Sequence, residues 1–347
     1  MAEVNHSPRQ TKGMHFLPCV MLSRFGEGLG RDAIVWVWDK ATGKTWRSKV
    51  AATARVNQLY RLPRKAVELL DGQQQLPPRH KGALAWERIF EDIEGNLGPI
   101  LDRIISTARL PAASSQEMFD LLHAIIICDS RTPARMKEIG RLVEVLLNRG
   151  EEIVKGVDPR ALDGDLTPHV DVPFDENRHL FLARSTALLE PYYKTISAMG
   201  WSLRVSLDGE YVICDYPFRW VFARTPEHDW DSPAPRVPNS MGMFPLSKTL
   251  LLTGESTVRG EVRLAGREWV AYHNTDAVLD AERWVYSHSD SFPVMWPPPI
   301  APAYKAIYDD HRQVMDMTRG FFAQLAANGG LPAPSRFELV APDEREH

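Results

Sequence analysis

Side chains that could do chemistry stand beside apolar stretches at several widely separated points in the chain. His15 lies in Met14-His15-Phe16-Leu17-Pro18, Arg131 in Ser130-Arg131-Thr132-Pro133, and Asp215 in Val212-Ile213-Cys214-Asp215-Tyr216-Pro217. Asn274 lies in Tyr272-His273-Asn274-Thr275. The ends of apolar elements meet at the edge of a core, so these residues can converge. The pattern therefore predicts one polar site built from distant motifs.

His15 and Asp215 are the candidate catalytic residues. An imidazole titrates near neutral pH, so His15 could act as a general base; alternatively, it is packed before a strand and bonded to backbone. Asp215 follows an apolar strand, where a carboxylate can bind a metal or orient a base. It can equally accept backbone N–H bonds in a turn.

Arg131 and Asn274 are the candidate binding residues. Arg131 could clamp a phosphate or carboxylate with two hydrogen bonds. The alternative is a structural ion pair with Asp215 or Glu87, or donation to carbonyls at a helix end. Asn274 could bind a ligand or cap a helix N-terminus.

Two glutamates supply candidate metal ligands. Glu87, Glu91 and Glu94 lie three or four residues apart, so two of them share one helical face, and Glu87 and Glu91 are the candidates. Together with Asp215 they could bind a divalent cation, the one candidate cofactor. A solvated helix face explains the same spacing.

Hydrophobic periodicity defines the elements that must position these residues. Apolar residues at helical spacing predict helices over 86–105, from the capping box of Ser114 and Glu117 onward, and from Thr132 onward with Pro133 in the first turn. Further segments with helical or strand patterns are helices over 176–199, 274–287 and 304–327, hairpins over 33–50 and 201–214, and strands over 248–253, 258–264 and 269–273. Gly, Pro and Asp predict loops over 156–175 and 226–238.

These elements predict an α+β fold in which a mostly antiparallel sheet of hairpins packs against a helical middle section. We expect one compact domain over residues 14–330, with flexible tails at 1–13 and 335–347.

Composition limits the partners. The formal charge of −4 gives no general basic surface for nucleic acid. The N-terminal residues lack the apolar run of a signal peptide, and no run is long enough to span a bilayer. Three widely spaced cysteines predict neither a disulfide framework nor a zinc site. We therefore expect a soluble cytoplasmic protein that does not bind a membrane, acting on an unknown small-molecule or nucleic-acid substrate.

Taken in order, the motifs resemble an uncharacterised bacterial family, number 4238 among the domains of unknown function. The resemblance covers about residues 14–290. The matching positions are His15 and Pro18, Glu87 or Glu91, Arg131-Thr132-Pro133, Cys214-Asp215-Tyr216-Pro217, Pro245-Leu246-Ser247, Asn274, and Trp284-Val285-Tyr286. The chain departs from the family at Cys19, where Gln is frequent, and at Cys214, where Ser is preferred. The resemblance implies no particular reaction.

Two hypotheses for function follow. One is a metal-assisted or His-dependent hydrolase or nuclease-like enzyme that uses His15, Asp215, a glutamate and Arg131. The other is a non-catalytic ligand-binding or regulatory module in which the same residues form a structural polar cluster.

Overall fold

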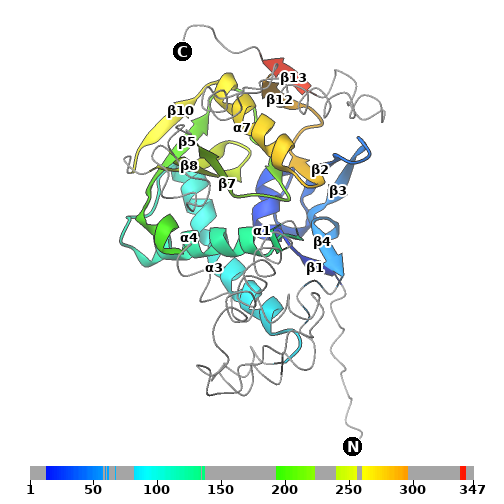
Figure 1. Ribbon diagram of the computed structural model, residues 1–347, viewed down its shortest axis with the longest axis vertical. Helices are drawn as coiled ribbons and strands as arrows, with labels where there is room; N and C mark the ends of the chain where they lie inside the picture. The colour runs from blue at the N-terminus through cyan, green and yellow to red at the C-terminus, as the bar shows by residue number, and fades with distance from the viewer. Residues whose placement is uncertain are drawn as a thin grey trace, which may run out of the picture.

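The fold is α+β, as predicted, with its strands in several sheets rather than one (Figure 1). The computed structural model describes residues 13–57, 59, 61, 67, 82–133, 135–136, 193–222, 240–255, 260–295 and 337–340. The expected loops at 156–175 and 226–238, the helix over 304–327, most of that over 176–199 and most of that after Thr132 lie outside these ranges.

The largest sheet has five strands in the order β10-β5-β9-β8-β7. Its strands are β5 (Gly200–Ser206), β7 (Arg219–Phe222), β8 (Ser240–Ser247), β9 (Leu250–Glu255) and β10 (Val262–Ala265). All neighbours are antiparallel except β10 and β5. Phe244 and Leu246 of β8 and Leu250 and Leu252 of β9 join the main hydrophobic core, whereas Met243 and Leu251 belong to a separate small cluster.

A second, four-stranded antiparallel sheet has the order β3-β2-β11-β6. Its strands are β2 (Ile34–Asp39), β3 (Thr45–Lys49), β6 (Ile213–Cys214) and β11 (Trp284–Ser287). One face contributes Val37 and Tyr286 to the main core. The other face contributes Trp38 and Val285 to a smaller core that α7 (Arg267–Asp280) covers. This sheet therefore separates two apolar layers.

Two short strand pairs complete the sheets. β1 (Gly13–His15) pairs antiparallel with β4 (Arg55–Asn57). β12 (Phe292–Met295) pairs parallel with β13 (Phe337–Val340), so residues within the expected tail over 335–347 form a strand.

The helical middle section packs against the main core. It consists of α3 (Ala85–Thr107) and α4 (Gln116–Ser130), and the short α1 (Cys19–Leu22) lies against α3 (Figure 1). Single 3₁₀ turns cover Ser23–Phe25, Gly30–Asp32 and Val50–Ala52. None of the described helices combines the length and the apolar character that crossing a membrane requires.

Local patterns predicted several elements correctly. The hairpin over 33–50 is β2 and β3, and the helix over 86–105 is α3. Thr132 caps the next helix, since its Oγ1 accepts a hydrogen bond from Arg135 N at 3.3 Å. The capping residue of α4 is Ser115, one position after the predicted Ser114, because Ser115 Oγ accepts from Met118 N.

Three predictions of secondary structure were wrong. The expected hairpin over 201–214 does not form, because β5 pairs with β9 and β10 while β6 pairs with β11. The expected strand over 269–273 is helical. Asn274 does not begin a helix: α7 begins at Arg267, and residues 284–287 form β11.

Candidate functional site

Several of the separate sequence motifs meet at one pocket of about 550 Å³. Phe16, Pro133, Asp215 and Tyr286 all line it. These residues come from four different motifs, yet each lies at or next to the end of an element or on a strand of the second sheet. The distant motifs therefore meet at this pocket. Two of their ionisable residues, His15 and Arg131, are not among the residues that line it.

The floor of the pocket is a row of side chains on the face of the second sheet opposite α7. Tyr286 pairs with Val37, and Val37 pairs with Trp46, so the three cross β11, β2 and β3 in register. Trp46 is 39% exposed, and its ring meets the ring of Trp284 edge-on at 5.7 Å between centroids. Aromatic faces and edges of this kind are typical of small-molecule sites.

Arg131 lies behind a wall of this pocket and is buried, with 1% of its surface exposed. Its Nε donates to the carbonyl of Phe16 at 3.1 Å, and its Nη2 lies 2.8 Å from Glu94 Oε1. Its guanidinium also lies over the ring of Phe90, 5.0 Å from the centroid. Arg131 thus ties the first motif to α3, and the ion-pair partner is Glu94 rather than the predicted Asp215 or Glu87.

His15 directly precedes Phe16, whose carbonyl binds Arg131. Burial is the main cause that lowers the pKa of His15, followed by the charge of Arg31; Arg131 and Arg55 act in the same direction and Glu94 opposes them. Its Nε2 lies 3.6 Å from Cys19 Sγ. Burial raises the pKa of Cys19, so the pair is neutral near pH 7 and is not a thiolate–imidazolium pair.

Two glutamates of α3, Glu94 and Glu87, interact with the same arginine. Burial raises the pKa of Glu87 to about 7, with Arg131 opposing the shift and Glu94 and Glu91 adding to it. Glu91 itself is exposed. Glu94 is the residue of this group that the sequence analysis did not select, because helical spacing alone does not reveal which carboxylate faces a distant arginine.

Asp215 is held by backbone N–H groups from the segment that precedes β11. Its carboxylate accepts hydrogen bonds from Glu282 N at 2.9 Å, Arg283 N at 2.8 Å and Trp284 N at 2.9 Å. Burial raises its pKa, although these three bonds act in the opposite direction. Asp215 is 4% exposed. Both of its oxygens therefore serve the backbone at the edge of the pocket.

Arg135 connects the corner after α4 with the segment around Asp215. Its Nε donates to Asp129 Oδ2 at 2.9 Å, and its guanidinium stacks 4.3 Å from the ring centroid of Tyr216. The sequence gives no signal for this contact, because an arginine one turn into a helix resembles any solvated position.

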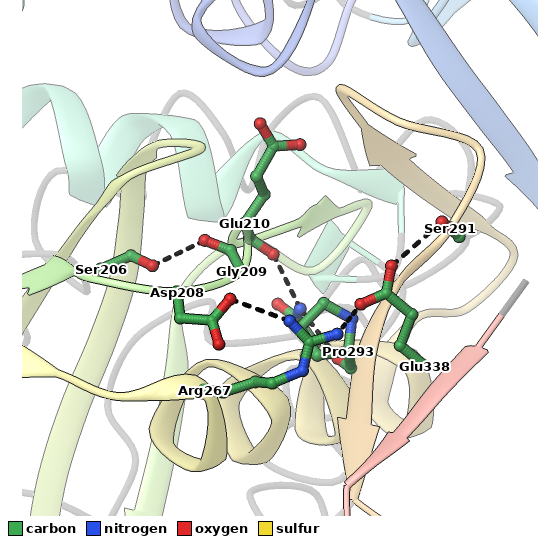
Figure 2. Close-up of polar contacts among 9 residues, drawn as sticks. Ser206, Asp208, Gly209, Glu210, Arg267, Ser291, Pro293 and Glu338 are labelled. Atoms are coloured by element: carbon green, nitrogen blue, oxygen red, sulfur yellow. Dashed lines mark hydrogen bonds and ion pairs between the residues drawn. The ribbon is translucent and has the colours of Figure 1, made fainter.

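Asn274 is buried in the middle of α7 and binds backbone rather than solvent. Its Oδ1 accepts from Val212 N at 3.0 Å, and its Nδ2 donates to the carbonyls of Glu210 and Pro293 at 2.9 and 3.0 Å. Figure 2 shows this junction, where Arg267 also bridges Asp208 and Glu338. Asn274 thus joins the turn after β5 to β12.

A buried pair next to Asn274 was also missed. Arg219 Nη1 donates to the carbonyl of His273 at 3.0 Å, and Nη2 lies 2.6 Å from His273 Nδ1. Burial holds the pKa of His273 well below its usual value. A neutral ring protonated at Nε2 accepts from Arg219 and donates to the carbonyl of Val212 at 3.2 Å. The available signal was a charged residue inside the apolar run Phe218-Arg219-Trp220-Val221.

The candidate metal ligands are not grouped. Within the described ranges, no three His, Cys, Asp or Glu side chains are placed to hold a metal ion together. Glu87 and Glu91 lie on α3, whereas the oxygens of Asp215 bind the N–H groups of 282–284.

Removal of Arg131 should destabilise the protein strongly. Arg131→Ala leaves Glu94 without its cation and the Phe16 carbonyl without a donor, so we expect a loss of about 3 kcal/mol or more in the free energy of unfolding. Arg103→Ala, which breaks the exposed pair with Glu117, is the control and should cost far less, because solvent screens an exposed ion pair. Urea denaturation measures both; equal losses would contradict a structural role for Arg131.

Two substitutions of Asp215 should differ in how much they destabilise the protein. Asp215→Asn keeps one acceptor oxygen and should cost about 1 kcal/mol, whereas Asp215→Ala leaves three N–H groups without an acceptor and should cost about 3 kcal/mol. Calorimetric melting of both variants tests this order. An Asp215→Ala variant as stable as the unmodified protein would show that Asp215 does not stabilise the fold by accepting these N–H bonds.

Ionisation of Glu87 should lower the free energy of unfolding as pH rises. Its pKa is about 7 in the folded protein against 4.5 ordinarily, so between these values the folded state holds a proton that the unfolded state has lost. Glu87→Gln should therefore raise the melting temperature at pH 8 and change it much less at pH 4. Glu91→Gln, at an exposed position of the same helix, is the control and should give a smaller pH-dependent change.

Comparison with known proteins gives a family and no reaction. The model of the family described as "Protein of unknown function (DUF4238)" matches residues 14–291. No curated protein and no solved structure matches the chain. The match spans all the motifs that converge at the pocket and on the contacts around it. The chain therefore belongs to the DUF4238 family of proteins of unknown function.

Proposed function

We propose that this protein is a non-catalytic ligand-binding module whose binding site is the pocket between the second sheet and the β1–β4 pair. The observation that carries this proposal is that residues of four distant motifs line one pocket of about 550 Å³. That volume lies in the range of small-molecule sites, which are lined mostly by apolar and aromatic side chains.

The state of the ionisable residues supports binding over catalysis. Arg131 is engaged by Phe16 and Glu94, and both oxygens of Asp215 accept backbone N–H bonds. A general base or an anion clamp must be able to meet its substrate. Residues so engaged are better suited to fixing the shape of a pocket.

A second candidate function rests on the neighbouring His15 and Cys19. A His-dependent hydrolase needs an imidazole within reach of a nucleophile, and His15 Nε2 lies 3.6 Å from Cys19 Sγ. Neither residue is among those lining the pocket, so this candidate ranks below binding. A divalent metal belongs only to this second candidate function, the enzyme.

A cytoplasmic location is part of the same proposal. The three cysteines are free and buried, which suits a reducing cytoplasm.

Filling the pocket should abolish ligand binding without unfolding the protein. Ser48 lines the pocket from β3, so Ser48→Trp should occupy it, whereas Lys49→Trp places the same ring on the opposite face of that strand. Native mass spectrometry of freshly purified full-length proteins should show a bound small molecule in the original protein and in Lys49→Trp, and none in Ser48→Trp.

Two results would count against the proposal. Equal retention of the ligand by Ser48→Trp, in a variant that melts normally, would move binding elsewhere. Hydrolysis of a general ester or phosphodiester substrate that is lost in both His15→Ala and Cys19→Ala, with the fold intact, would favour the enzyme.

A further inference from the structure

The side chains that face the pocket differ in how well their charges are balanced. Arg283 stacks on Trp284 and forms two hydrogen bonds with Asp39, at 3.2 and 3.0 Å. The Asp215 carboxylate is surrounded by three N–H donors. These two groups therefore have partners within the protein.

Arg55 is the exception on the other side of the pocket. It lines the pocket from β4 and is exposed, and it forms no ion pair with any residue in the described part of the chain. Its side chain lies beside Gly13 of β1: a Cβ on Gly13 would lie only 3.0 Å from Arg55 Cδ and 3.4 Å from its Nε. The absence of a side chain at Gly13 therefore lets the Arg55 stem lie against β1.

Several arginines act on His15, the residue that pairs with Arg55. His15 is directly opposite Arg55 in the β1–β4 register. The charges of Arg31, Arg131 and Arg55 all lower the pKa of His15, after the larger effect of burial, with Glu94 opposing them. In the lining of the pocket itself, the cations are Arg55 and Arg283, and the carboxylates are Glu282 and Asp215. The Asp215 carboxylate accepts three backbone N–H bonds, and Arg283 is paired with Asp39.

The floor of the pocket provides a complementary apolar surface. Trp46 and Trp284 form an edge-to-face pair, and Tyr286 continues the row beneath them. Flat rings gain from stacking and edge contacts with such side chains. A guanidinium binds a carboxylate or phosphate through paired N–H donors.

From these features we propose that the pocket binds a planar aromatic anion, with its ring on the Trp46–Trp284 side and its carboxylate or phosphate on Arg55. This inference rests on the proposed function, because it names the ligand chemistry of the same pocket. Carboxylate and phosphate are two sources of one anionic chemistry, and the experiment distinguishes them.

The test compares charged and neutral ligands of matched shape on the full-length protein. Isothermal titration calorimetry with 2-naphthoate and 2-naphthamide forms the carboxylate arm, and AMP and adenosine form the phosphate arm. In at least one arm we expect the anion to bind about tenfold more tightly than its neutral partner. The preference should weaken as salt is raised, because Arg55 is exposed.

Substitution then assigns the preference to one side chain. Arg55→Gln should remove the preference for the anion while the neutral ligand binds as before. Arg109→Gln removes one charge at another exposed position outside the pocket, and should leave the preference unchanged. Melting temperatures close to that of the original protein confirm that both variants fold.

The outcomes separate the inference from the function on which it rests. Equal binding of anion and neutral ligand in both arms, or an anion preference that persists in Arg55→Gln, overturns the ligand class while the pocket remains a binding site. Failure of all four compounds to bind also overturns it, and the Ser48→Trp comparison then decides separately whether the pocket binds anything.

Discussion

The buried guanidinium of Arg131 is the interaction on which the arrangement around the pocket depends. It bonds to the Phe16 carbonyl and to Glu94, and it lies over the Phe90 ring. One side chain therefore connects the strand end at β1, helix α3 and the corner after α4. A buried charge is costly unless it is paired, so the three segments can only come together in an arrangement that supplies these partners.

Further contacts extend this connection from motif to motif. Arg135 joins the corner after α4 to Tyr216, and Asp215 then joins the same segment to residues 282–284 before β11. On the other face of the second sheet, His273 and Asn274 bind the carbonyl and the N–H of Val212. Each motif thus contributes a polar side chain that fixes the backbone of another motif.

Sequence patterns predicted the parts of the fold that depend on residues close together in the chain. Helix α3, the Thr132 cap and the hairpin of β2 and β3 follow from local periodicity and capping. The hairpin expected over 201–214 failed because β5 finds its partners at β9 and β10, far along the chain. Helix α7 was missed because its apolar residues face two cores and leave no single apolar stripe.

The same distinction applies to the candidate site. Polar residues at element ends were expected to gather above a core, with His15, Arg131 and Asp215 in one network. Arg131 binds the carbonyl of Phe16, next to His15, whereas Asp215 binds the backbone of residues 282–284. The identity of each partner was not predictable: which of three glutamates meets Arg131 depends on how α3 and α4 cross. The backbone donors that surround Asp215 belong to a segment 67 to 69 residues away, and side-chain spacing carries no information about them.

A polar residue beside an apolar element can serve a ligand or another backbone segment, and the geometry here favours the second role for the motif residues. A strand end leaves N–H and carbonyl groups without ladder partners, and burying them unpaired would be costly. Asp215 and Asn274 each satisfy such groups, and Arg131 satisfies one more. The side chains left to meet a ligand in the proposed site belong to β3, β4 and β11, where Trp46, Ser48, Arg55 and Trp284 line the pocket. In that proposal these side chains select the ligand, while Asp215, Asn274 and Arg131 fix the backbone around it.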